Sequence, residues 1–281
     1  MNLTGRARPV ADPAGRLVAR SGLPTGASPR WEPPVTPLLD VRGVDKSFGP
    51  VQVLHEAALS VHPGEVTALV GDNGAGKSTL IKCLGGILPM DAGDVLFEGR
   101  PVRVSGPRDA AELGIEIVHQ DFALCDNLSV AENMFLGRER RRGLVLDEAD
   151  MERRAAQALA ALSIRTVGSV RRPVGSLAGG QRQSVAIARA MLWGSRVVVL
   201  DEPTASLGLA HAQQVLEAAR KLADRGLAVV LISHNMNDVF SVADRITALF
   251  LGRTVAQVRA SEVTHTQVVE LITSGRVTPT L

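Results

Sequence analysis

The 281-residue sequence has only two cysteines, almost no net charge and no long hydrophobic run. Cys83 and Cys125 lie far apart without metal-ligand spacing around them, which argues against zinc, and we interpret both as reduced cytosolic thiols. No apolar run approaches the roughly 18 residues of a membrane span, and the N-terminus has no continuous apolar signal region. Any role at a membrane is therefore expected to be peripheral.

A surplus of one charge is also missing, because 31 basic and 29 acidic residues leave a net charge of +2. Nucleic-acid-binding domains concentrate positive charge, so we expect no nucleic-acid partner. No internal repeat is visible, which indicates a single copy of the domain. Hydrophobic residues make up 45% of the chain, enough for a sizeable core.

The composition changes near residue 36. Residues 1–36 are rich in proline, glycine and arginine, so we expect a disordered N-terminal extension, with a partner-binding arm as the alternative. Beyond it, the apolar segments IEIV, RVVVLDE, LAVVLIS and ITALFLG are typical of strands buried on both faces of a parallel sheet. Residues 37–281 are thus predicted to form an α/β domain with a mainly parallel sheet. Between residues 121 and 172 helical spacing replaces the strand pattern, which predicts a helical insert.

The stretch GDNGAGKST follows the apolar run VTALV and precedes a helical pattern. This is the context of a P-loop, whose glycines let backbone N–H groups surround phosphate oxygens. Lys77 would reach the β- and γ-phosphates, and Ser78 would give its hydroxyl to Mg²⁺. A plain glycine-rich turn is the alternative, but such a turn has no use for the Lys-Ser pair. The predicted nucleotide-binding residues are Gly71, Asp72, Asn73, Gly74, Ala75, Gly76, Lys77, Ser78 and Thr79.

Two carboxylates end the apolar strand in RVVVLDEPTAS. A nucleotide hydrolase must hold Mg²⁺ and direct water, and we assign Asp201 to the metal and Glu202 to the water as general base. An acidic pair after a strand is more often a helix cap or a loop charge, and the P-loop is what favours catalysis here.

Polar residues also end two other predicted strands, His234 after LAVVLIS and Gln120 after IEIVH. Ligands of parallel α/β sheets bind at the carboxyl ends of the strands. Both side chains are therefore candidates to sense the γ-phosphate and the metal-bound water, and solvated loop residues are the alternative.

The stretch LAGGQ, Leu177 to Gln181, places two glycines shortly before the apolar helical pattern QSVAIARAML. Glycine destabilises a helix interior by about 1 kcal/mol relative to alanine, so a pair at this point indicates a backbone that approaches something closely. The segment by itself predicts an anion site at a helix N-terminus and does not identify the anion.

The order of these motifs resembles that of the ATP-binding cassette (ABC) ATPases from about Leu38 to the C-terminus. In that family a P-loop, a Q-loop glutamine, a signature glycine pair, a Walker B strand and a switch histidine occur in this order. The matching positions here are Gly71 to Thr79, Gln120, Leu177 to Gln181, Val197 to Glu202, and His234. The resemblance implies a cassette with an antiparallel β subdomain and a helical subdomain at about residues 121–185.

The resemblance also implies partners. The signature residues Ala178, Gly179, Gly180 and Gln181 would contact ATP held by a second cassette, in a homodimer or with a paired ATPase. The segment Gln120 to Leu124 would dock a transmembrane permease, and Gln120 would also contact the metal. Phe48, upstream of the P-loop, would stack on adenine, with a core phenylalanine as the alternative.

Finer features, including LCDNLSVAENMFLGRE and ISHNMNDVFSVADRI, are similar to cassettes of bacterial simple-sugar importers, which work with a permease and an extracytoplasmic sugar-binding protein at the inner membrane. Two positions depart from the family. Ala178 replaces a serine whose hydroxyl contacts the γ-phosphate, and Gly208 stands where the family has an aspartate after Walker B.

The first hypothesis is therefore an ATPase subunit that energises the import of a simple sugar. Because of Ala178, one alternative is a weakly catalytic cassette that regulates an active partner. A soluble ABC protein acting on ribosomes or DNA is a further alternative. The basic cluster RERRRG, Arg138 to Gly143, favours a solvated face, with lipid headgroups or the permease as the alternative contact.

Overall fold

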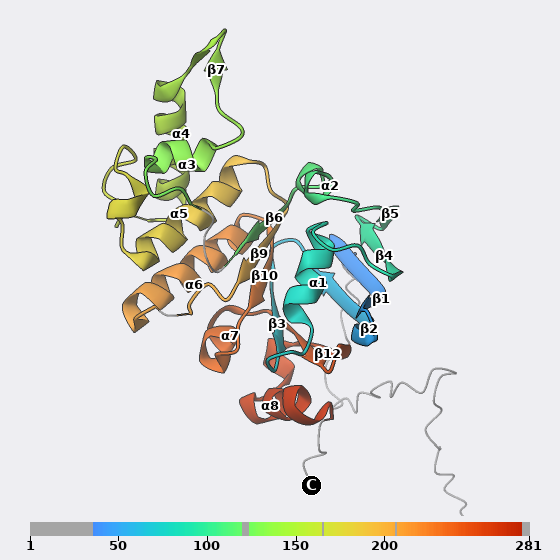
Figure 1. Cartoon of the computed structure of the whole chain (residues 1–281). Helices are drawn as coiled ribbons and strands as arrows, with labels where there is room; N and C mark the ends of the chain where they lie inside the picture. Colours follow the sequence, from blue (N-terminus) through green and yellow to red (C-terminus); the bar gives the residue numbers. More distant parts are fainter. Residues whose placement is uncertain (1–35, 120–123, 165, 206, 277–281) are drawn as a thin grey trace, which may run out of the picture. The chain divides into compact units, whose positions relative to one another are not determined.

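The computed structural model describes residues 36–119, 124–164, 166–205 and 207–276. The chain divides into Met1–Val35 and Thr36–Leu281, and only the second unit is described (Figure 1). Apart from Thr36, the expected N-terminal extension lies outside the described residues, so its disorder stays a prediction.

A six-stranded sheet forms the centre of the domain, in the order β12-β11-β3-β10-β9-β6. All neighbouring strands pair in parallel except β11 and β12, which are antiparallel. Apart from Thr67 and the terminal Asp201, the strands of the centre are apolar, because helices or a second sheet cover both faces. The mainly parallel α/β core is confirmed. Its strands are β3 (Val66–Gly71), β6 (Ile115–Val118), β9 (Val197–Asp201), β10 (Ala228–Ile232), β11 (Arg245–Phe250) and β12 (Arg253–Arg259).

A four-stranded antiparallel sheet, in the order β2-β1-β4-β5, lies beside the six-stranded sheet. Its strands are β1 (Leu39–Phe48), β2 (Val51–Val61), β4 (Ala92–Phe97) and β5 (Arg100–Val102). Alternate residues of β1 and β2 are buried against helix α1 (Lys77–Leu84) and one face of the six-stranded sheet. Helix α2 (Pro107–Glu112) precedes β6. The P-loop helix is thus enclosed between the two sheets.

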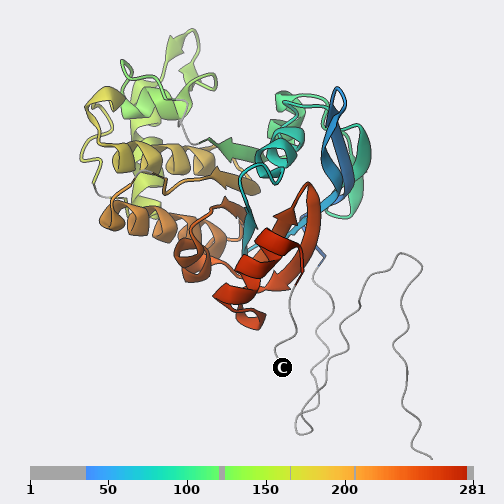
Figure 2. The ribbon, with the colours of Figure 1, turned by 60° about the horizontal axis from the view of Figure 1, so that its bottom comes forward.

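Further helices cover the opposite face of the six-stranded sheet. Helix α6 (Leu209–Asp224) packs on β10 and β3, and α8 (His265–Ser274) packs on β11 and β3 (Figure 2). Helix α7 (Met236–Val242) follows β10 and contacts α6, and a short 3₁₀ turn, Ala260–Glu262, precedes α8. Gly275 ends α8 with φ 70°, the left-handed geometry expected after a helix.

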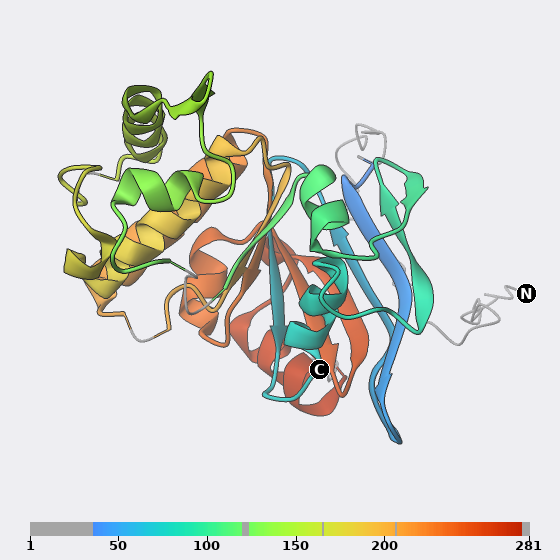
Figure 3. The ribbon, with the colours of Figure 1, turned by 45° about the horizontal axis from the view of Figure 1, so that its top comes forward.

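Helices dominate the chain between β6 and β9, where they form one apolar cluster (Figure 3). They are α3 (Val130–Phe135), α4 (Glu148–Ala161), the 3₁₀ turn Val174–Ser176 and α5 (Gly179–Leu192). Asp147 caps α4 by accepting a hydrogen bond from Asp150 N at 3.0 Å, as its sequence context predicts. Helix α5 ends at Leu192, where the predicted helical pattern QSVAIARAML ends. The helical subdomain at about residues 121–185 stays a prediction.

One feature of this region was not expected. Arg141 and Arg142 of the basic cluster form β7 (Arg141–Arg142), which pairs with β8 (Val145–Leu146) in a two-stranded hairpin. This hairpin lies inside the insert that was predicted to be helical. Gly143 turns the chain with φ 68°, and the Leu144 side chain beside it is fully exposed.

None of the helices in the described residues has the length and hydropathy needed to cross a bilayer.

Candidate functional site

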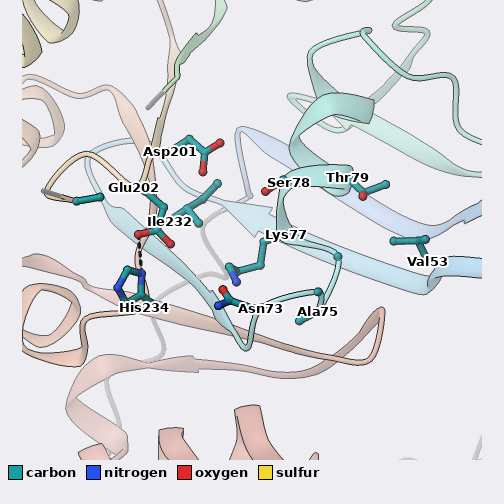
Figure 4. A pocket seen from close by; sticks show the side chains of 13 residues that line it. Val53, Asn73, Ala75, Lys77, Ser78, Thr79, Asp201, Glu202, Ile232 and His234 are labelled. Carbon is teal, nitrogen blue, oxygen red and sulfur yellow. Dashed lines mark ion pairs between the residues drawn. The ribbon is translucent and has the colours of Figure 1, made fainter. Parts of the chain in front are cut away.

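The carboxyl ends of β3, β10 and β9, which are neighbours in the sheet, carry the predicted site residues. The P-loop follows β3, the acidic pair ends β9, and His234 lies two residues after β10. Together they surround a cavity of about 430 Å³ (Figure 4). Its lining consists of Val53, Asn73, Gly74, Ala75, Gly76, Lys77, Ser78, Thr79, Asp201, Glu202, Ala205, Ile232 and His234.

The P-loop backbone requires glycine at two positions for different reasons. Gly76 caps α1 with φ 101°, a conformation that residues with a side chain rarely adopt. A Cβ atom on Gly71 would lie 2.6 Å from the carbonyl oxygen of Leu249, which is backbone and cannot rotate away. The turn therefore leaves bare N–H groups at the start of α1 facing the cavity.

The Lys77 ammonium is held by its own loop. Its Nζ donates hydrogen bonds to Gly71 O at 2.8 Å and to Asp72 O at 3.0 Å, and the residue is only 8% exposed. Burial lowers the pKa of Lys77, and the nearby Glu202, Asp72 and Asp201 carboxylates oppose this effect. A buried cation beside the bare N–H groups makes the cavity suited to phosphate.

Asp201 is the first of the two acidic groups at the end of β9, and it is partly buried. Burial raises the pKa of Asp201, and the negative charge of Glu202 raises it further. In the part of the chain that the structure describes, no three acidic, histidine or cysteine side chains cluster as a metal site. A cation in this cavity would thus rely on the Ser78 hydroxyl, the Asp201 carboxylate and phosphate oxygens, which is how Mg²⁺ is usually bound with nucleotides.

Glu202 and His234, predicted from separate strands, are in direct contact. His234 Nδ1 lies 2.7 Å from Glu202 Oε2, and the imidazole N–H donates to the carboxylate (Figure 4). The Glu202 side chain is 19% exposed, whereas that of His234 is 67% exposed. Glu202 also has φ 50°, unusual for a residue with a side chain, and its N–H donates to Ile232 O at 3.0 Å.

Phe48 does not line the cavity. It ends β1 with 47% of its surface exposed, and Lys46 Nζ lies 5.7 Å from its ring centroid. It is thus not the core phenylalanine of the alternative interpretation, and its stacking on adenine stays a prediction. Gln120 lies outside the described residues, and of the segment Gln120 to Leu124 only Leu124 is described, packed against the helical cluster.

The LAGGQ segment also lies outside the cavity lining. Ala178 occupies the N-cap position of α5 without a side-chain acceptor, and its N–H donates to Gln181 Oε1 at 2.9 Å. A Cβ atom on Gly180 would lie 2.8 Å from His211 Cβ on α6, whereas one on Gly179 would meet only Leu207 Cδ2 at 3.8 Å. The close approach predicted from the glycine pair is therefore made at Gly180, to a neighbouring helix.

Three lining residues were not predicted from the sequence: Val53, Ala205 and Ile232. Ile232 ends β10, so its place at a strand terminus was a usable signal, and Ala205 follows Glu202 in the same loop. Val53 belongs to β2 of the other sheet, and only the packing of the two sheets brings it to the P-loop.

Comparison with known proteins agrees with this geometry. The model of the ABC transporter family matches residues 54–205. A fructose import ATP-binding protein of Rhizobium meliloti is 44% identical over 86% of this chain and 96% of its own length. A xylose/arabinose import ATP-binding protein of Sulfolobus acidocaldarius is 42% identical over 84% of this chain and 94% of its own.

Solved structures give the same assignment. An ABC transporter cassette in its ADP conformation has a TM-score of 0.73 and 26% identity, over 86% of this chain and 96% of that structure. A nucleotide-free cassette has a TM-score of 0.71 and 27% identity, over 79% of this chain and 91% of the other. The chain therefore belongs to the ABC transporter family, as an ATP-binding cassette with ATPase activity.

Proposed function

We propose that this cassette binds and hydrolyses ATP to energise the import of a simple sugar through a membrane permease. The observation that carries the proposal is the cavity in which Lys77 and Ser78 face the Glu202–His234 pair. The relatives named for fructose and for xylose/arabinose import support the substrate class. The domain would extend over residues 37–281, with a helical subdomain at about 121–185.

ATP would bind with its phosphates at the P-loop. Backbone N–H groups between Gly74 and Thr79 would surround the phosphate oxygens, and Lys77 would exchange its two carbonyl partners for the β- and γ-phosphates. Phe48 would stack on adenine. Ser78 and Asp201, with Gln120, would hold Mg²⁺, which when bound neutralises charge on the phosphates.

Hydrolysis would depend on Glu202. Its carboxylate would orient the attacking water and accept the water proton, and the bond from His234 would fix the carboxylate. In addition, His234 is exposed enough to contact the γ-phosphate. Because the two groups come from adjacent strands, a shift of either loop would disrupt the pair.

The cycle would require partners. Ala178, Gly179, Gly180 and Gln181 would contact ATP held by a second cassette, which would couple ATP binding to dimer closure and hydrolysis to opening. The permease would dock near Gln120–Leu124, and an extracytoplasmic sugar-binding protein would deliver the sugar. The cassette would lie on the cytoplasmic face of the membrane, with no nucleic acid involved.

A weakly catalytic cassette that regulates an active partner is a second candidate, because Ala178 has no hydroxyl for the opposite γ-phosphate. Loss of one charge-assisted hydrogen bond would weaken closure by about 1.5 to 3 kcal/mol. Turnover by the chain in a homodimer would exclude this candidate.

The test is reconstitution of the full chain with the permease and sugar-binding protein encoded by neighbouring genes. Proteoliposomes should take up radiolabelled fructose, xylose, arabinose or ribose only with MgATP, and Glu202→Gln should abolish uptake while ATP binding persists. Uptake without ATP, or ATP turnover by Glu202→Gln equal to the wild type, would refute the proposal.

A further inference from the structure

A second polar contact joins the two loops that carry Glu202 and His234. Thr204 Oγ1 donates a hydrogen bond to Asp238 Oδ2 at 2.6 Å. Thr204 lies two residues after Glu202, and Asp238 lies four residues after His234, so the contact runs alongside the Glu202–His234 pair. Neither Thr204 nor Asp238 lines the cavity, and neither is assigned a role by the motifs.

The His234 side chain has little packing of its own to hold it. With 67% of its surface exposed, the imidazole can change rotamer at small cost unless its hydrogen bond to Glu202 persists. That bond in turn requires the backbones of the two loops to stay at a fixed separation. A hydrogen bond from Glu202 N to Ile232 O restrains one side, at the end of the strands.

Helix α7 supplies a fixed position for Asp238. Asn235 begins the helix by accepting a hydrogen bond from Asn237 N at 3.0 Å. Val239 is fully buried under the helix, and the Phe240 ring stacks on the His265 ring of α8 at 4.0 Å. Asp238 therefore presents its carboxylate from an element that is anchored to the C-terminal helix.

The Thr204–Asp238 bond is of a strong type. A hydroxyl that donates to an ionised carboxylate makes a charge-assisted bond, typically about 2.5 to 2.7 Å long, and this contact is partly buried. Removal of the Thr204 hydroxyl would leave the Asp238 carboxylate without this donor. The loop after Glu202 would then lose its tie to α7.

We propose that Thr204 and Asp238 are positioning residues for ATP hydrolysis. Their hydrogen bond holds the loop after β9 against the segment after β10, so that His234 keeps its hydrogen bond to Glu202. The inference rests on the proposed roles of Glu202 and His234. It assigns Thr204 and Asp238 an effect on turnover and none on ATP binding, because the phosphate-binding lining is untouched.

The experiment measures ATP hydrolysis by the full chain with its permease, for Thr204→Val and Thr204→Ser. Valine keeps the shape but removes the hydroxyl, so kcat should fall about tenfold while KM for ATP stays within about twofold. Serine keeps the hydroxyl, so Thr204→Ser should have a kcat close to that of the wild type. Equal kcat for wild type and Thr204→Val, or equal losses for both variants, would overturn the inference.

A double-mutant cycle with His234→Ala separates positioning from general damage to the fold. If Thr204 acts through His234, Thr204→Val should lower kcat no further once His234 is alanine, and additive losses would overturn the inference. Glu202→Gln serves as the control for the proposed function. If Glu202→Gln still hydrolyses ATP the proposed catalytic role fails, whereas an inactive Glu202→Gln with an unaffected Thr204→Val removes the positioning role alone.

Discussion

The P-loop, Gly71 to Thr79, and the signature segment, Leu177 to Gln181, are both glycine-rich turns that lead into a helix. The first lines a cavity and holds a buried ammonium over its carbonyls. The second lines no part of that cavity, and its Gly180 lies against His211 of the neighbouring helix. Similar composition thus serves a ligand in one place and helix packing in the other.

The two regions differ in the side chains that come directly after the glycines. In the P-loop these are Lys77 and Ser78, which supply a cation and a hydroxyl. In the signature segment they are Gln181 and Arg182, whose side chains bond to nearby backbone groups. Arg182 donates to Leu177 O and Gly175 O, both at 3.2 Å, and pairs with Asp126 at 3.0 Å. Of these two described segments, the P-loop therefore combines helix N–H groups with a cation and a hydroxyl beside a cavity, and the signature segment does not.

The largest difference is expected between the two basic residues Lys77 and Arg182. Lys77→Met should lower kcat for ATP hydrolysis by about 100-fold or more, because the cation of the phosphate site is lost. Arg182→Met should leave the ATP affinity of the isolated chain within about twofold. Titration with a fluorescent ATP analogue and steady-state kinetics measure both. An equal loss of affinity in the two variants would remove the distinction between the regions.

Alanine substitutions at Gly71 and Gly179 should lower the free energy of unfolding by different amounts. Gly71→Ala should lower the free energy of unfolding by about 2 to 3 kcal/mol, because the added Cβ meets backbone. Gly179→Ala should change it by less than about 0.5 kcal/mol, since space is free there. Urea denaturation of the purified chain gives both values, and similar losses would show that the space around the glycine does not govern stability.

Gly180→Ala should have an intermediate cost of about 1 to 2 kcal/mol in urea denaturation, because the new Cβ crowds His211. The helix propensity of alanine offsets part of this loss. In the double variant with His211→Ala, part of the cost should disappear, since two of the three close contacts are made by ring atoms. A cost that is independent of residue 211 would contradict the packing role of Gly180.

A modest gain in stability is expected at Ala178. Ala178→Ser would supply the missing N-cap acceptor of α5 and should raise the free energy of unfolding by about 1 kcal/mol. The same hydroxyl should raise ATP turnover if its absence limits dimer closure. Thermal denaturation and hydrolysis assays distinguish these effects. A variant with unchanged stability would indicate that the hydrogen bond between Gln181 and Ala178 already stabilises the start of α5 sufficiently.

The sequence predicted the parts of the site that local chemistry determines. The P-loop, the acidic pair and His234 were found because their motifs follow apolar strands, and the parallel sheet then brings the strand ends together. Val53 could not be predicted, because an apolar residue on β2 gives no sign of which turn it will face. Gly180 was predicted to make a close approach, but the identity of its neighbour depends on how α6 packs.

The fold was predictable to a similar extent. Apolar runs identified the parallel strands, whereas the β7–β8 hairpin is too short for any periodicity to indicate. The start of α4 has a local cause, because the Asp147 side chain caps the helix. The predicted helical pattern QSVAIARAML ends at Leu192, where α5 also ends. Trp193, directly after it, packs edge-on against the Phe135 ring at 5.4 Å.

At Glu202 the residue that is best for stability differs from the residue that is needed for activity, because the backbone there is left-handed. A residue with a side chain in this conformation costs about 1 to 2 kcal/mol relative to glycine, and Glu202 adopts it with φ 50°. Glycine at position 202 would relieve that cost and remove a carboxylate that lines the cavity. A library of variants selected only for heat resistance should therefore accumulate glycine or asparagine at this position, and the most thermostable members should be inactive.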